Sequence, residues 1–194
     1  MARPREFDTD KALRAMMNLF WERGYEGTSM HMIEQATGLR KQSLYRAFGD
    51  KRGMYLAALT AYEHEEMNKT GAILARPGSA AARFGQLFRH VIDRAINDGD
   101  RRGCFLCNAG IDQAPLHAAT GERVAEMVSQ VEEIFAHALS DGGPGNSSPG
   151  TRSIARSLLA GYFGLRVLVT SGANQETLED AASGFLSMIP SVSG

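Results

Sequence analysis

The sequence contains little cysteine, only two residues in 194, and no long apolar run. So few cysteines exclude the disulfide-stapled scaffolds of small secreted proteins, which need several bridges. A membrane-spanning helix requires about 18 or more mostly apolar residues, and no uncharged apolar run of that length occurs. The first residues also lack the apolar stretch of a signal peptide. We therefore expect a cytoplasmic protein without a membrane-spanning segment.

Motifs of common enzyme classes are also missing. The sequence has neither the Gly-x-Ser-x-Gly pattern of many hydrolases nor a phosphate-binding loop that ends in Gly-Lys-Ser/Thr. No second pair of ligands stands near Cys104 and Cys107 at the spacing of a zinc finger. We therefore expect no enzymatic activity, no bound metal and no cofactor.

The composition is that of an ordinary globular protein, but the charges are unevenly distributed. Hydrophobic residues make up 43% and charged residues 22%, so the chain can bury a core. The net charge of −1 excludes a uniformly basic nucleic-acid coat. Residues 1–53 hold ten Lys or Arg against seven Asp or Glu, whereas the rest of the chain holds 11 against 15. A basic head on an acidic body is the balance that a polyanion-binding head would have.

Apolar residues recur with helical spacing along the chain, and strand-like alternation is nearly absent. Asp8 or Thr9 can cap the first amphipathic helix, and Gly24 can end it. The predicted helices cover residues 9–23, 29–37, 41–48, a long segment from 51 towards 76, 79–97, 104–115, 117–139, 154–170 and 175–188. The composition of residues 141–150 predicts a flexible loop. We therefore predict an all-α protein.

Residues 28–48 have the pattern of a helix-turn-helix, with Gly38 at the turn, where the backbone needs a positive φ angle. Apolar residues would form a small core beneath this turn, namely Ile33, Ala36, Leu39, Leu44 and Phe48. The second helix then keeps donors for phosphates and base edges on its free side, namely Arg40, Lys41, Gln42, Ser43, Tyr45 and Arg46. This second helix would enter the major groove of DNA.

The same segment resembles the DNA-binding domain of the TetR/AcrR family of bacterial transcriptional regulators. The resemblance is carried by Thr28-Ser29-Met30, Ile33, Thr37-Gly38-Leu39, Lys41, Ser43-Leu44-Tyr45, Phe48 and Lys51. It implies a three-helix DNA-binding domain, residues 1–53, joined by a long helix to a helical effector-binding and dimerisation domain, residues 54–194. It also implies a homodimer formed by the last two helices, and a repressor that a small-molecule effector releases from a palindromic operator.

The resemblance also implies roles for single residues. Thr28 and Lys51 are expected to contact phosphates. The recognition surface is expected to consist of Lys41, Gln42, Ser43, Tyr45 and Arg46. Within that surface, Gln42 suits adenine and Arg46 suits guanine, whereas Tyr45 fits the DNA backbone. Three residues depart from the usual family pattern, namely Glu34, which stands where a small residue is common, Gln42 and Ala47.

Two N-terminal arginines leave two alternatives open. Arg3 and Arg5 could form an arm that reaches into the minor groove, or belong to a disordered tail.

The cysteine pair supports an alternative hypothesis about regulation. Cys104 and Cys107 are spaced by three, which predicts one helix face. Arg101, Arg102 and a helix N-terminus would lower the pKa of the Cys104 thiol. The pair could therefore serve a redox- or electrophile-sensing regulator, or it could be two small buried residues. The runs Gly103-Cys104-Phe105-Leu106 and Asn108-Ala109 resemble one branch of the family.

A ligand pocket is predicted between the C-terminal helices, although each candidate residue could also be plain core. The candidates are Phe84, Phe88, Cys107, Ile111, Met127, Val131, Phe135, Tyr162, Phe163 and Arg166. Arg166 is the most informative of them, because a charge inside an apolar helix needs a partner. That partner could be an acidic side chain across the dimer or an anionic group on the ligand.

Overall fold

The computed structural model describes residues 8–140 and 148–190, and these residues form nine helices and no strand. The helices are α1 (Thr9–Arg23), α2 (Met30–Thr37), α3 (Lys41–Phe48), α4 (Lys51–Leu74), α5 (Ala80–Ile96), α6 (Phe105–Asp112), α7 (Ala118–Leu139), α8 (Pro149–Thr170) and α9 (Gln175–Leu186). The predicted all-α architecture is confirmed. None of the helices in these two ranges is both long and apolar enough to cross a membrane.

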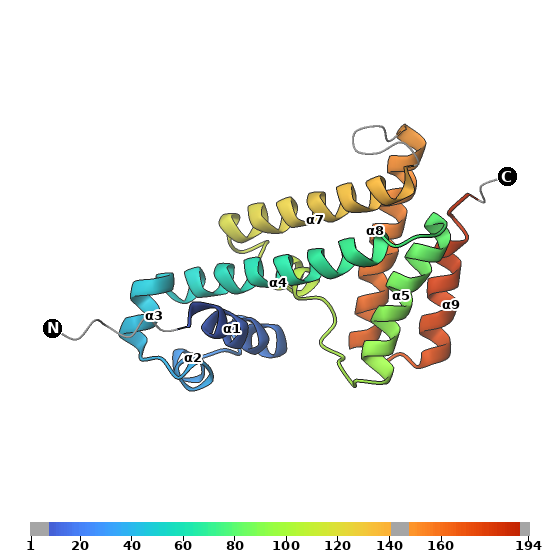
Figure 1. The fold of residues 1–194 in the computed structure, drawn as a ribbon. Coiled ribbons are helices and arrows are strands. Elements are labelled where there is room, and N and C mark those ends of the chain that lie inside the picture. The colour runs from blue at the N-terminus through green and yellow to red at the C-terminus, as the bar shows by residue number, and fades with distance from the viewer. Residues whose placement is uncertain (1–7, 141–147, 191–194) are drawn as a thin grey trace.

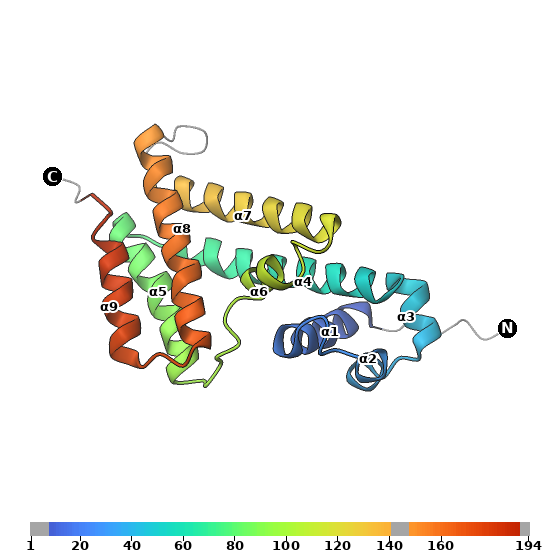
Figure 2. The ribbon, with the colours of Figure 1, turned by 180° about the vertical axis from the view of Figure 1, so that it is seen from behind.

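The long helix α4 runs through the middle of the molecule (Figure 1). Helices α1, α2 and α3 gather at its N-terminal end, α7 lies along it, and α5, α8 and α9 stand together at its other end (Figure 1). The opposite view shows α6 close to the middle of α4 (Figure 2). A single rigid element therefore connects the N-terminal helices with the C-terminal ones.

Helix starts follow from local capping. Asp8, Ser29 and Asp50 each accept a hydrogen bond from a backbone N–H of the first turn of α1, α2 and α4 respectively. The prediction for α8 was less accurate, because this helix begins at Pro149, five residues earlier than expected. Its start is explained by Ser148, whose hydroxyl accepts from the Thr151 amide, and by a proline in the first turn.

Several other predicted boundaries differ by one to three residues. Helix α6 ends at Asp112 rather than at Pro115, and α9 ends at Leu186 rather than at residue 188. Cys104 is the N-cap residue of α6 and not its first helical residue. Most of the predicted loop 141–150, together with Arg3 and Arg5, lies outside the described residues.

The small core of the helix-turn-helix forms around two residues. Ile33 and Leu44 are fully buried, whereas Leu39 and Phe48 are half-buried. Ala36, expected to belong to this core, is exposed. Gly38 ends α2 with φ 69° and ψ 11°, the left-handed conformation that the turn requires.

The hydrophobic core around α1 also includes residues from the C-terminal part of the chain. Buried residues of α1 and α4 pack in one cluster with residues of α6 and α7. Tyr55 of α4 meets the ring of Phe105 edge-to-face, with centroids 5.4 Å apart, and Trp21 meets Tyr62 in the same way at 4.9 Å. The proposed domains, residues 1–53 and 54–194, therefore share both α4 and an aromatic core.

Candidate nucleic-acid interface and buried polar cluster

Helix α3 presents a basic and polar surface to solvent. Lys41, Gln42 and Arg46 are exposed, and Tyr45 is 40% exposed. Because Lys41 and Tyr45, like Gln42 and Arg46, are four positions apart, the two pairs occupy neighbouring faces of a short helix. The Lys41 ammonium lies 5.4 Å from the centroid of the Tyr45 ring. Leu44 anchors the opposite side of α3 in the core, so this polar surface stays free for a partner.

The remaining residues of the predicted DNA surface are placed differently from one another. Arg40 is exposed at the N-cap position of α3, and Ser43 is half-buried. Lys51, at the start of α4, is half-buried with its ammonium 4.2 Å from the centroid of the Tyr25 ring.

Thr28 does not fit the predicted role of a phosphate contact in this geometry. The residue is fully buried, and its hydroxyl donates to the Gly24 carbonyl over 2.8 Å. A buried hydroxyl that is already bonded inside the turn between α1 and α2 has no free path to DNA. The sequence pattern did not predict this burial, because a threonine just before an N-cap serine is expected to lie at the surface.

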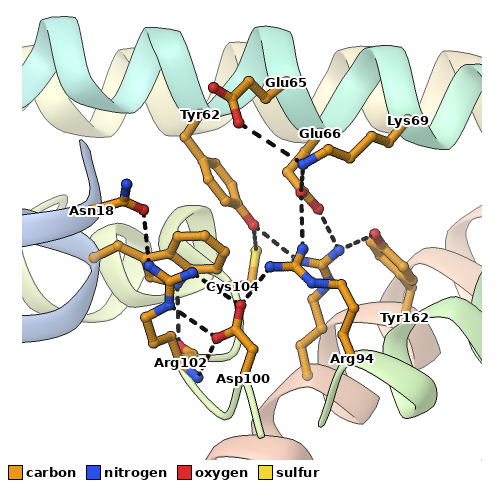
Figure 3. A network of polar contacts seen from close by, with 12 residues as sticks. Asn18, Tyr62, Glu65, Glu66, Lys69, Arg94, Asp100, Arg102, Cys104 and Tyr162 are labelled. Carbon is orange, nitrogen blue, oxygen red and sulfur yellow. Dashed lines mark hydrogen bonds and ion pairs between the residues drawn. The ribbon is translucent and has the colours of Figure 1, made fainter. Parts of the chain in front are cut away.

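Arg166 of α8 is the centre of a polar cluster that includes Tyr62 and Glu66 of α4. Figure 3 shows these partners with the residues around them. Arg166 is only 5% exposed. Its guanidinium donates to the Tyr62 hydroxyl over 2.8 Å, to Glu66 Oε2 over 2.5 Å, and to the Tyr162 hydroxyl. The predicted partner was an acid across the dimer or on a ligand, and this was wrong, because Glu66 of the same chain supplies the charge.

The ion pair determines the protonation state of Glu66. Burial by itself raises the pKa of this carboxyl, but the charge of Arg166 and its hydrogen bond outweigh burial and lower the pKa below its usual value. Glu66 therefore stays ionised at neutral pH.

The cluster continues from Glu66 to the N-terminal helices (Figure 3). Arg94 of α5 lies 3.6 Å from Glu66 and pairs with Asp100, which in turn binds Arg102 over 2.9 Å. The Arg102 guanidinium stacks 3.9 Å from the centroid of the Trp21 ring, and the Trp21 indole N–H donates to the Arg102 carbonyl over 3.2 Å. A continuous chain of polar contacts thus links α8 with α1.

Cys104 lies at the edge of the same cluster. The Tyr62 hydroxyl, which accepts from Arg166, donates to Cys104 Sγ over 3.4 Å. Burial raises the pKa of the Cys104 thiol, but a hydrogen bond from Cys107, the charge of Arg166 and the Tyr62 hydroxyl outweigh it and lower the pKa to about 6. Donation to Cys104 and burial together raise the pKa of the Cys107 thiol.

The direction of the Cys104 shift agrees with the prediction, and so does the expected contribution of a helix N-terminus, because a backbone hydrogen bond from Cys107 in the first turn of α6 also lowers the pKa. The two expected arginines were wrong. Arg101 donates to the carbonyls of Val169 and Ala173 instead of facing the thiol. Arg102 is paired with Asp100. The cation that acts on Cys104 is Arg166, which is distant in the sequence and therefore invisible to local pattern analysis.

Replacing Tyr62 with phenylalanine should raise the pKa of Cys104 from about 6 towards the ordinary value, because the thiolate loses a donor. The ultraviolet absorbance of the thiolate, followed against pH with Cys104→Ser as baseline, measures this midpoint. Tyr45→Phe is the matched control, since Tyr45 lies on the exposed surface of α3. An unchanged midpoint in Tyr62→Phe would contradict the contact.

A cavity lies beside the cluster, between α4, α6, α7 and α8. It leaves about 30 Å³ for water-sized molecules. Five of the predicted pocket residues line it, namely Met127, Val131, Tyr162, Phe163 and Arg166. The other lining residues, which sequence reasoning missed, are Tyr62, Glu63, Glu66, Met67, Thr70, Cys104, Leu106 and Ile134.

The other predicted pocket residues lie elsewhere. Phe84, Phe88 and Phe135 are fully buried in the core of the C-terminal helices. Cys107 packs at the edge of the core around α1, and Ile111 is 70% exposed. None of these five lines the cavity beside Arg166, and Phe88 lines a separate hollow between α5 and α9.

The contribution of α4 to this cavity could have been recognised in the sequence. Leu59, Tyr62, Glu66 and Thr70 recur at intervals of three and four, so the carboxylate stands on the buried stripe of the helix. An acid in such a stripe needs a buried partner, and Arg166 is that partner.

The structure combines a helix-turn-helix, whose second helix is basic and exposed, with a larger group of helices that encloses a cavity. This combination defines a DNA-binding transcriptional regulator. A family model described as bacterial regulatory proteins, tetR family, matches residues 12–58. The chain belongs to the TetR family and acts as a DNA-binding transcription factor, not as an enzyme.

Individual relatives agree with this assignment. The HTH-type transcriptional regulator YezE of Bacillus subtilis (strain 168) is 28% identical over 97% of this chain and 100% of its own length. The HTH-type transcriptional repressor ComR of Escherichia coli (strain K12) is 33% identical over 55% of this chain and 51% of its own. Among solved structures, a cysteine mutant of the TetR family regulator CifR complexed with 26-bp operator DNA is similar, with TM-score 0.82 and 29% identity, over 97% of this chain and 100% of that one.

Proposed function

We propose that this regulator is a cytoplasmic homodimeric repressor that binds a palindromic operator and that a small molecule releases. The observation that supports DNA binding is the exposed polar surface of α3. Leu44, on the other side of this helix, anchors it in the core. Side chains of this surface can donate to phosphates and base edges in the major groove. The proposed contacts are Arg40, Lys41, Gln42, Ser43, Tyr45, Arg46 and, at the start of α4, Lys51. The operator complex of the relative CifR supports this proposal.

The proposed dimer forms through α8 and α9. Val167 on α8 is 51% exposed and Met188, just after α9, is 43% exposed, so apolar surface remains uncovered there. Burying these side chains against a second copy would be favourable. A twofold pair of chains would place two copies of α3 in successive major grooves, about 34 Å apart.

The proposed effector site is the cavity beside Arg166. Its present volume of about 30 Å³ is too small for an organic effector, so binding must displace side chains such as Met67 and Met127. Methionine side chains adapt easily to such a change. Two buried atoms at this cavity have no partner, namely Glu63 Oε1 and Arg166 Nε. An uncharged, mostly apolar molecule with one donor and one acceptor would satisfy both, whereas the charge of Arg166 is already balanced by Glu66.

Release would follow from the position of the cavity. The helix that lines it with Tyr62 and Glu66 is α4, which also carries the N-terminal helices. An effector that fits better when α4 is displaced would shift the population towards a form in which the two α3 helices no longer match the operator. A coupling free energy of about 1–3 kcal/mol is sufficient for a large change in occupancy.

A second candidate function is regulation by oxidation of Cys104. The lowered pKa of Cys104, about 6, and the contact with Cys107 favour it, because the thiolate is the reactive form. In this alternative no organic effector is needed. Mild peroxide treatment should then change the mass of the protein and release DNA, and Cys104→Ser should abolish both effects.

The repressor proposal is tested with the purified protein and DNA from upstream of its own gene, in a gel shift against scrambled competitor. We expect a specific shift that weakens steeply with salt, because phosphate contacts release counterions. Footprinting should show protection with twofold symmetry. Binding that ignores salt and sequence would refute the proposal.

A further inference from the structure

The recognition helix α3 has an unusual start. Three other helices of the N-terminal part, α1, α2 and α4, are capped by their own N-cap side chains, Asp8, Ser29 and Asp50. At the same position α3 has Arg40, whose side chain makes no capping hydrogen bond. Arginine has no acceptor atom and cannot serve as a cap.

The missing acceptor is supplied from α2. Glu34 Oε1 accepts a hydrogen bond from the Lys41 backbone N–H over 2.6 Å, across seven residues of sequence. Lys41 is the first residue of α3. A carboxylate at this position satisfies one of the free amides of the first turn and also interacts favourably with the helix dipole. Glu34 thereby connects the two helices on either side of the Gly38 turn.

We propose that Glu34 is a positioning residue for DNA recognition, which caps α3 from α2 and so frees the N-cap position for Arg40. The proposal rests on the proposed binding of α3 to DNA. Glu34 is the residue that departs from the small side chain common in the family, and this capping contact gives the departure a physical role.

The charge of Glu34 has a second consequence. Its carboxylate occupies the Lys41 amide, which would otherwise be free to donate to a phosphate. It also places a negative charge at the end of α3 that contacts base edges. A complex with random DNA is held by phosphate contacts alone and can bring this carboxylate against them, whereas base contacts fix the position of α3 on the operator. Glu34 therefore weakens binding to random DNA more than binding to the operator and raises selectivity.

Capping is tested without DNA by a double-mutant cycle of Glu34→Ala and Arg40→Ser. Serine at residue 40 restores a local cap, so Glu34→Ala should lower the melting temperature clearly in the wild-type background and much less in the Arg40→Ser background. Equal effects in both backgrounds would overturn the capping role. This readout does not depend on whether the protein binds an operator.

Selectivity is tested with Glu34→Gln, which keeps the acceptor oxygen and removes the charge. We expect its affinity for random duplex DNA to rise about three- to tenfold at low salt, with a smaller rise for the operator. Gln35→Glu, an exposed neighbour changed in the opposite sense, controls for net charge. An unchanged operator-to-random ratio in Glu34→Gln would overturn the selectivity role. If the wild type binds no DNA at all, the proposed function itself fails, while the capping cycle still stands.

Discussion

Replacing Glu66 with alanine should lower the free energy of unfolding by about 3–5 kcal/mol, because it leaves the buried Arg166 without its carboxylate. Arg166 is 5% exposed, so water cannot take over the role of the partner. For a chain of this size the loss corresponds to a decrease in melting temperature of roughly 6–20 °C. Thermal unfolding followed by circular dichroism measures it.

The matched control is Glu65→Ala, the neighbouring acid on α4. Glu65 is half-exposed and lies 3.8 Å from Lys69 at the surface. Such a surface pair contributes less than about 1 kcal/mol. Equal effects of the two substitutions would show that Arg166 does not depend on Glu66.

The stability that Glu66 provides should also depend on pH. Since the folded protein lowers the pKa of Glu66 below the ordinary value of 4.5, the stabilisation is complete above that value and is lost as the pH falls through the folded pKa. The difference in melting temperature between wild type and Glu66→Ala should therefore shrink in acid.

Replacing Arg46 with alanine should weaken operator binding by about 10- to 100-fold, the range that one bidentate contact to guanine provides. The melting temperature should change little, because Arg46 is exposed on α3. A gel shift titration with operator and with random DNA measures the effect. The loss should be larger for the operator, since a base contact distinguishes sequences and a phosphate contact does not.

Arg89→Ala is the matched control for this experiment. Arg89 is exposed on α5, outside the N-terminal helices, and its loss changes the net charge by the same amount. If Arg89→Ala weakened binding as much as Arg46→Ala, the effect would be one of overall charge. Unfolding of the N-terminal helices by Arg46→Ala would contradict the placement of Arg46 at the surface.

The helices could be predicted because their causes are local. Asp8, Ser29 and Asp50 lie next to the amides that they cap, and Gly38 produces the turn by its own backbone freedom. The largest missed boundary, at Pro149, also has a local cause in Ser148, which was read as part of a loop.

The candidate DNA surface could largely be predicted for the same reason. With Leu44 directed into the core, helical geometry alone decides that Lys41, Gln42 and Arg46 lie on other faces. Thr28 is the exception, since its burial depends on how the turn between α1 and α2 packs.

The sequence by itself thus determined the helices, the helix-turn-helix and the exposed polar surface of α3, whose causes act over a few residues. The tertiary structure decided the partner of Arg166, which lies 100 residues away in Glu66. It likewise decided the environment of Cys104 and the cap that Glu34 provides for α3. Charges buried between helices interact through space, and their pairing depends on how α4, α6 and α8 pack together, which no local pattern encodes.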